Sequence, residues 1–130
     1  AVTVYIVVVG IVYNLVLRWQ WHFTGLQKLV DEMLHLVIPL FVLAYWYFFV
    51  SSASIKWKEA FKWMLYPFIY CIYILIRGAV SGFYPYPFMR VNELGYAKVF
   101  INCIFVTLAF FLVSMILIGA GRMSSKKVTA

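Results

Sequence analysis

Charged side chains are scarce in this sequence. Asp, Glu, Lys and Arg make up 12% of the 130 residues, and four residues are acidic. A soluble domain is typically about one quarter charged, so a chain with this few charges could not cover its surface with polar groups. Hydrophobic residues make up 66% of the sequence. The shortage of charge therefore excludes an ordinary soluble fold and favours a protein that lies in lipid.

Cysteine is also rare, with two residues, Cys71 and Cys103. Both fall inside apolar stretches, where the rise of a helix predicts different depths, so no disulfide between them is expected. They lack the spacing of metal ligands, and we predict neither a metal site nor a cofactor. Two small buried hydrophobic side chains are the simpler interpretation.

Long apolar runs make up most of the chain. They cover residues 1–17, 29–50, 60–81 and 97–120. A helix of about 20 residues spans the roughly 30 Å hydrocarbon core of a bilayer. The runs predict an all-α fold, a polytopic transmembrane helix bundle with four spans. We expect one transmembrane domain over residues 1–121 and a basic tail over residues 122–130.

The first run is short and begins at residue 1 without a methionine. It also lacks the basic n-region of a signal peptide. We therefore expect this chain to be part of a longer protein.

The distribution of lysine and arginine predicts an orientation. The turn between the second and third runs and the C-terminal tail carry most of these residues, which are Lys56, Lys58, Lys62, Arg122, Lys126 and Lys127. The positive-inside rule places both regions in the cytoplasm. The net charge of +7 thus predicts membrane lipids as partners and no nucleic acid, because the basic residues lie in loops and in the tail.

The loop at residues 82–96, GFYPYPFMRVNELGY, is rich in proline and aromatic residues. Proline cannot continue a helix, so Tyr84 and its neighbours are expected to form a stiff apolar lid at the membrane surface. Helix rise places one polar side chain of each run at nearly the same depth beneath this lid. These side chains are Asn14, His35, Arg77 and Asn102.

The second run opens with three titratable residues close together. Asp31 is four residues before His35 and Glu32 is three before it, so both acids can reach the imidazole. A neighbouring acid can fix the tautomer of a histidine that acts as a general base. Pro39 cannot donate to the carbonyl of His35, which should leave that oxygen for a water or a ligand.

The third run carries a polar stripe. Tyr66, Tyr70, Tyr73 and Arg77 follow one helix face at intervals of four, three and four residues. A buried arginine needs a partner, and Asp31 or Glu32 would serve as its counter-ion. The GxxxG spacing of the glycines at 78 and 82 predicts the close approach of another helix.

Three segments resemble the prokaryotic six-transmembrane membrane proteins, and through them the eukaryotic androgen-induced membrane protein family. These segments are LVDEMLHLVIPL, MLYPFIYCIYILIRGAVSGFYPYPF and VNELGYAKVFIN. The resemblance implies that the chain is the C-terminal four spans of a six-span protein, in a bacterial inner membrane. Its relatives are intramembrane hydrolases that pair a threonine nucleophile with a histidine on a later span. His35 matches that histidine, and the threonine would lie on an earlier span.

Two functions of different classes follow. In the first, the protein hydrolyses lipid esters, with His35 as general base, Asp31 or Glu32 as orienting acid, and Arg77 and Asn102 holding a carboxylate or oxyanion. Further candidates for substrate contact are Asn14, Tyr73 and Tyr84. In the second, the same polar layer is structural and the protein is a lipid-binding module or a scaffold. Transport is a third alternative, and a homo-oligomer is open in each case.

Overall fold

The computed structural model describes residues 1–20, 22–50 and 55–128. Within these ranges, four helical segments are long and apolar enough to cross a membrane, namely Val2–Gln20, Gly25–Phe49, Glu59–Ser81 and Val91–Met123. No strand occurs in the described part of the chain. The prediction of an all-α transmembrane fold with four spans is confirmed, and the chain has the length and composition of an integral membrane protein.

The first two of these segments each contain a short π-helical turn. The first segment consists of α1 (Val2–Val12), the π-helical turn η1 (Tyr13–Leu17) and the 3₁₀ turn η2 (Arg18–Gln20). The second consists of α2 (Gly25–Glu32), the π-helical turn η3 (Met33–Val37) and α3 (Ile38–Phe49). A π-helical turn holds one extra residue and is frequent at functional sites.

The third and fourth segments are interrupted at proline and glycine. The third consists of α4 (Glu59–Trp63) and α5 (Leu65–Ser81). The helix α4 ends at Trp63, four residues before Pro67. In a continuous helix the ring of Pro67 would clash with the carbonyl of Trp63, and Pro67 has no N–H to donate to that carbonyl. The 3₁₀ turn η4 (Pro87–Met89) precedes α6 (Val91–Val128), which is broken at Gly95 by φ 75° and ψ 160°. The fourth helical segment thus starts six residues earlier than the apolar run.

The chain divides into two compact units. The first contains Ala1–Trp57 and Val113–Ala130, and the second contains Lys58–Leu112. The helix α6 contributes to both of them. The single transmembrane domain expected from the sequence stays a prediction.

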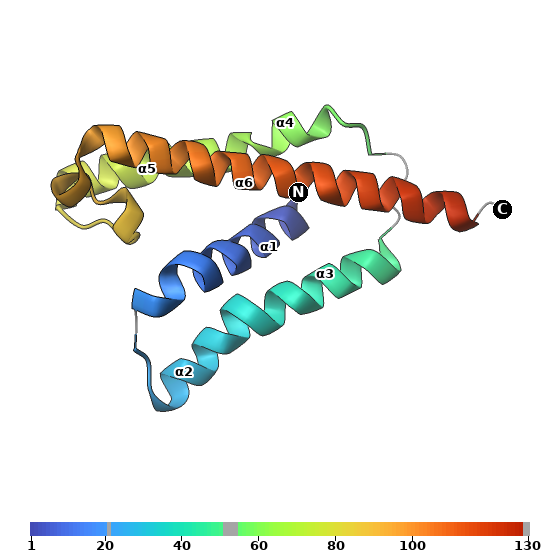
Figure 1. Cartoon of the computed structure of the whole chain (residues 1–130), viewed down its shortest axis with the longest axis horizontal. Helices are drawn as coiled ribbons and strands as arrows, with labels where there is room; N and C mark the ends of the chain where they lie inside the picture. Colours follow the sequence, from blue (N-terminus) through green and yellow to red (C-terminus); the bar gives the residue numbers. More distant parts are fainter. Residues whose placement is uncertain (21, 51–54, 129–130) are drawn as a thin grey trace. The chain divides into compact units, whose positions relative to one another are not determined.

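In the first unit, α1 and α3 lie side by side (Figure 1). A Cβ atom on Gly10 would lie 2.9 Å from the ring atoms of Pro39, so only glycine permits this approach. The end of α6 packs against Trp57, with the guanidinium of Arg122 lying 5.7 Å from its ring. The buried side chains of this unit include Val4, Val8, Trp46, Ser114 and Ile118.

In the second unit, α5 packs against the N-terminal part of α6. The rings of Phe61 and Phe111 lie 5.3 Å apart. Midway along the pair, the thiols of Cys71 and Cys103 lie 3.2 Å apart, and both cysteines are free. The prediction that the two cysteines lie at different depths was wrong, because their sulfur atoms are in contact.

The connection between α5 and α6 folds back onto α5. A Cβ atom on Gly78 would lie 2.0 Å from the ring of Tyr84, which is 6% exposed. Gly82 ends α5 in a left-handed conformation with φ 72°. Gly78 therefore makes room for the Tyr84 ring, where the GxxxG spacing predicted a helix. Gly82 ends α5.

Candidate functional site

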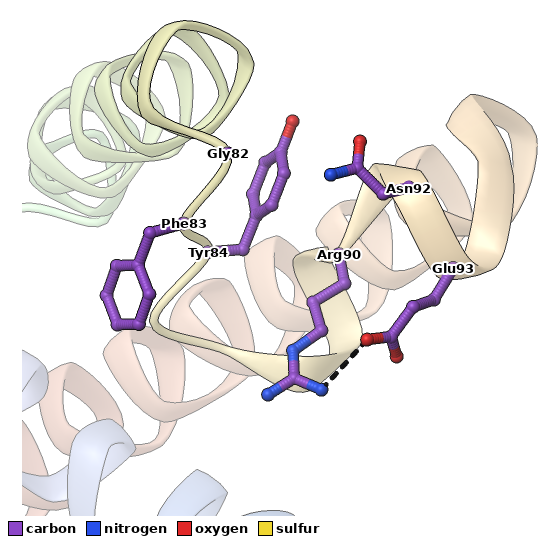
Figure 2. Close-up of a pocket in the computed structure, with 6 residues that line it drawn as sticks. All are labelled: Gly82, Phe83, Tyr84, Arg90, Asn92 and Glu93. Carbon is purple, nitrogen blue, oxygen red and sulfur yellow. Dashed lines mark hydrogen bonds and ion pairs between the residues drawn. The ribbon is translucent and has the colours of Figure 1, made fainter.

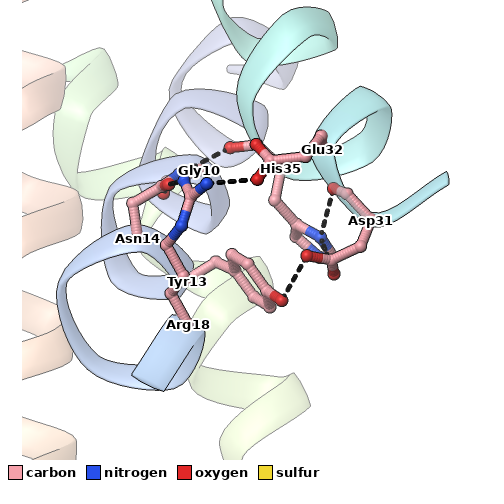
Figure 3. Close-up of polar contacts among 7 residues, drawn as sticks. All are labelled: Gly10, Tyr13, Asn14, Arg18, Asp31, Glu32 and His35. Atoms are coloured by element: carbon pink, nitrogen blue, oxygen red, sulfur yellow. Dashed lines mark hydrogen bonds and ion pairs between the residues drawn. The ribbon is translucent and has the colours of Figure 1, made fainter. Parts of the chain in front are cut away.

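The main polar cluster of the first unit lies where the two π-helical turns η1 and η3 face each other (Figure 3). Its members are Gly10, Tyr13, Asn14, Arg18, Asp31, Glu32 and His35. The close approach of α1 and α3 at Gly10 brings their backbones together here. Because a π-helical turn accommodates one extra residue, the residues after it lie on a different face from the one that regular α-helical spacing would give them.

His35 is held on one side by Asp31. Its Nδ1 atom lies 3.1 Å from the carboxylate oxygen Oδ1 of Asp31 and 3.1 Å from the backbone oxygen of the same residue. The side chains of His35 and Asp31 are 26% and 15% exposed. Two acceptors on Nδ1 favour the tautomer with its proton there. The lone pair of a neutral imidazole is then on Nε2, which has no hydrogen bond within the described residues.

Tyr13 contacts both His35 and Asp31. Its ring stacks on the imidazole with centroids 3.7 Å apart and an interplanar angle of 13°. Its hydroxyl donates to Oδ2 of Asp31 at 2.5 Å. The two carboxylate oxygens of Asp31 thus have different partners, Tyr13 and His35, so neither the acid nor the ring can rotate without losing a contact.

Asn14 joins the two helices through their backbones. Its Nδ2 atom donates to the carbonyl oxygen of Gly10 at 2.8 Å and to that of His35 at 2.8 Å. Because Pro39 has no N–H, the carbonyl of His35 lacks its usual donor from the helix. The sequence suggested that this oxygen would be left for a water or a ligand. That suggestion was wrong, because the oxygen accepts from Asn14.

Arg18 forms the outer part of the cluster. It donates to Oδ1 of Asn14 at 2.6 Å and forms an ion pair with Glu32. The two acids therefore have separate partners: Asp31 contacts His35, and Glu32 contacts Arg18. Of the two acids considered for orienting the histidine, Asp31 has the required contact. Glu32 has its ion pair with Arg18, which follows Asn14 by one helical turn. The predicted pairing of Arg77 with Asp31 or Glu32 stays a prediction.

The other predicted site residues lie in the second unit. The guanidinium of Arg77 lies 5.6 Å from the ring centroid of Phe83. Asn102 donates to the carbonyl of Phe88 at 2.8 Å and so fixes the connection to α6. Tyr84 is buried against Gly78. The convergence of Arg77 and Asn102 with the residues of the first unit stays a prediction.

The tyrosine stripe on α5 is present. The ring centroids of Tyr66 and Tyr70 lie 6.3 Å apart, as do those of Tyr70 and Tyr73. The hydroxyls of Tyr70 and Tyr86 lie 3.0 Å apart, which links the stripe to the connection after α5. Burial and the bond to Tyr70 raise the pKa of Tyr86, so its hydroxyl stays protonated at neutral pH. The tyrosine stripe thus holds the connection between α5 and α6 against α5.

Sequence reasoning missed Tyr13 and Arg18 as members of the cluster. A signal for Arg18 was available, because Gly10, Asn14 and Arg18 are four residues apart and share a helix face. A small residue, an amide and a cation on one face of an apolar helix indicate a contact with another helix. No comparable spacing singles out Tyr13, whose position depends on the π-helical turn.

The described residues contain no group of three or more His, Cys, Asp or Glu side chains that could hold a metal ion. The cluster offers a histidine oriented by a carboxylate, with an amide and an ion pair behind it. Comparisons of the chain with protein-family models, curated proteins and solved structures gave no match.

Proposed function

We propose that the chain acts as part of an integral membrane hydrolase of lipid esters, with His35 as the general base. One observation carries this proposal: Nδ1 of His35 lies 3.1 Å from Oδ1 of Asp31, and the ring is stacked on Tyr13. A general base needs a fixed ring, a defined tautomer and one nitrogen that is open to the substrate. His35 meets these requirements through Asp31 and Tyr13.

The reaction that suits this arrangement is attack on an ester carbonyl. The Nε2 atom of His35 would accept a proton from a hydroxyl or a water as its oxygen forms the new bond to the carbonyl carbon. The same proton would leave on the alkoxide of the departing alcohol. Asp31 would balance the positive charge that His35 carries between these two steps. The resemblance described above suggests a threonine hydroxyl as the nucleophile. The acyl group would then stay on the threonine oxygen until a water, deprotonated by Nε2 of His35, attacks the ester carbonyl, and the fatty acid would leave as the threonine oxygen takes the proton back.

Substrate class and location follow from the surroundings of the cluster. His35 lies in a span whose other side chains are mostly apolar, so a substrate with acyl chains can approach it from the lipid. We propose a bacterial inner membrane and a cytoplasmic C-terminal tail, on the basis of the resemblance and of the lysine-rich turn and tail.

The proposal is tested with the protein purified in detergent and supplied with fatty acid esters of hydroxy fatty acids. We expect His35→Ala to lower turnover by about 10²- to 10⁴-fold, the usual contribution of a general base. The matched control is His22→Ala, because His22 is the other histidine of the chain and lies in the exposed connection before α2. Asp31→Asn keeps the shape of the acid and should also lower turnover.

Labelling with a fluorophosphonate probe gives a second measurement, since it reports an activated hydroxyl directly. His35→Ala should abolish the labelling and His22→Ala should preserve it. Turnover that is equal in the wild type and in His35→Ala would reject the role of His35 as base.

A second function is favoured by a different observation. Asn14 bridges the carbonyls of Gly10 and His35, so part of the cluster holds two helices together without any chemistry. If the protein is a scaffold or a lipid-binding module, His35→Ala should lower the unfolding temperature, and no ester turnover should be found in the wild type.

A further inference from the structure

The end of α6 meets the connection that precedes α4 at the ring of Trp57. A Cβ atom on Gly119 would lie 3.4 Å from this ring, so the indole lies against α6 at that residue. One helical turn later, the guanidinium of Arg122 lies 5.7 Å from the centre of the same ring. A guanidinium within about 6 Å of an indole is attracted by the negative face of the ring. Trp57 therefore holds the charge of Arg122 at the end of the fourth span.

Two lysines flank Trp57 in the sequence. Lys56 and Lys58 are both exposed, and within the described residues neither has an ion pair. Trp57 itself is 44% exposed, and tryptophan is enriched where a protein crosses the membrane–water interface. We call Lys56, Lys58 and Arg122 the basic patch. The position of Trp57 among these residues indicates that the basic patch lies at the level of the lipid headgroups.

The positive charge of the basic patch is not neutralised by the acidic residues of the chain. The four acidic residues all have partners outside the basic patch. The pairs are Asp31 with His35, Glu32 with Arg18 (Figure 3), Glu59 with Lys62, and Glu93 with Arg90 (Figure 2). The three cations of the basic patch carry one positive charge each, so this charge is available to an anion outside the chain.

We propose that the basic patch binds the headgroups of anionic phospholipids. Each lysine or arginine near an anionic membrane surface contributes about fivefold to binding. Arg122 can also donate two parallel N–H groups to a phosphate, since one face of its guanidinium lies toward Trp57 and the N–H groups point outward from its edge. The sequence predicted membrane lipids as partners, and the basic patch narrows this to lipids with a negative headgroup. The binding is independent of the proposed hydrolase activity.

Native mass spectrometry of the detergent-purified protein tests this proposal. The probes are dioleoyl phosphatidylglycerol, which has a negative headgroup, and dioleoyl phosphatidylcholine, which has the same acyl chains and phosphate but no net charge. We expect the first lipid to bind at least about tenfold more tightly, after allowance for screening of the three charges. The difference should shrink as the concentration of ammonium acetate is raised, because salt screens exposed charges. Inorganic phosphate at the same concentration should not displace phosphatidylglycerol.

Substitutions locate the binding. The double variant Lys56→Gln/Lys58→Gln changes exposed side chains and should lower the affinity for phosphatidylglycerol about fivefold, with the affinity for phosphatidylcholine unchanged. The matched control is Lys28→Gln/Lys98→Gln, which removes the same charge from exposed positions near the starts of the second and fourth spans. This control should keep the preference of the wild type. Arg122→Gln should weaken the binding, and Arg122→Lys should preserve most of it.

Several results would overturn the proposal. One is equal affinity of the wild type for the two lipids. Another is a preference that survives both the double lysine variant of the basic patch and Arg122→Gln. A preference that the control variant loses to the same extent would show an effect of the total charge, which also contradicts a role of the basic patch. Displacement of phosphatidylglycerol by inorganic phosphate would show a site for the free anion and would overturn the assignment to a lipid.

Discussion

Replacing Gly78 by alanine tests the packing of Tyr84 on α5, on which the shape of the α5–α6 connection depends. The added Cβ atom would lie 2.0 Å from Cε1 of Tyr84 and 2.3 Å from Cδ1. Carbon atoms pack best at about 3.5–4.0 Å, so the ring would have to move by about 1.5 Å. The ring is rigid, and Tyr84 is 6% exposed. The substitution therefore displaces Tyr84 as a whole.

The cost can be estimated from these distances. Overpacking a well-packed site typically costs about 1–3 kcal/mol, and the better helix propensity of alanine recovers up to about 1 kcal/mol. We expect Gly78→Ala to lower the free energy of unfolding by about 1–2 kcal/mol. Gly119→Ala is the matched control in α6, because its Cβ would meet only Trp57, at 3.4 Å. That variant should be as stable as the wild type or more stable.

The assay is thermal unfolding in detergent, followed with a dye that becomes fluorescent on reaction with free thiols. Cys71 and Cys103 are free and partly buried between α5 and α6, so the dye reports the separation of these helices. If Gly78→Ala unfolds at the same temperature as Gly119→Ala, Tyr84 does not pack on Gly78 and the reasoning is refuted.

Two further predictions concern the contacts between helices. Asn14→Ala removes the donor to the carbonyls of Gly10 and His35 and should lower the free energy of unfolding by about 1–2 kcal/mol, since hydrogen bonds between helices in membranes average about 0.6 kcal/mol and reach about 1.7. Asn92→Ala changes an exposed side chain at the start of α6 and should have no such effect. Equal unfolding temperatures for the two variants would contradict the role of Asn14. Mild oxidation should join Cys71 and Cys103 in a disulfide, because their sulfur atoms lie 3.2 Å apart and need to approach by about 1.1 Å to reach the bond length of about 2.05 Å. The intact mass should fall by the two thiol hydrogens, and Cys71→Ser should block the change; two thiols that stay reactive after oxidation would show that the helices pair differently.

The four spans could be predicted because hydropathy acts over whole segments. Runs of about 20 apolar residues define helices in lipid whatever the partners of each side chain are. The pairing of Asp31 with His35 was predictable for a similar reason, since residues four apart on a helix are neighbours. Local spacing along one helix was sufficient for both predictions.

Contacts between helices were not predictable in this way. The partner of the His35 carbonyl is Asn14, and that contact depends on the close approach of Gly10 to Pro39. Two separate helices must therefore be placed before the contact can be seen. The error for Cys103 has a related origin, because its level relative to Cys71 depends on how α5 and α6 are aligned, which the hydropathy of each segment does not give.

The paired π-helical turns make the first unit sensitive to chain length. Each residue of an α-helix turns the chain by about 100°. A π-helical turn is wider and accommodates one extra residue. If η1 became a regular α-helix with its residue count unchanged, Arg18 would swing about 100° away from Glu32. The count of residues between Gly10 and Arg18 is thus as much a part of this site as the identity of its side chains.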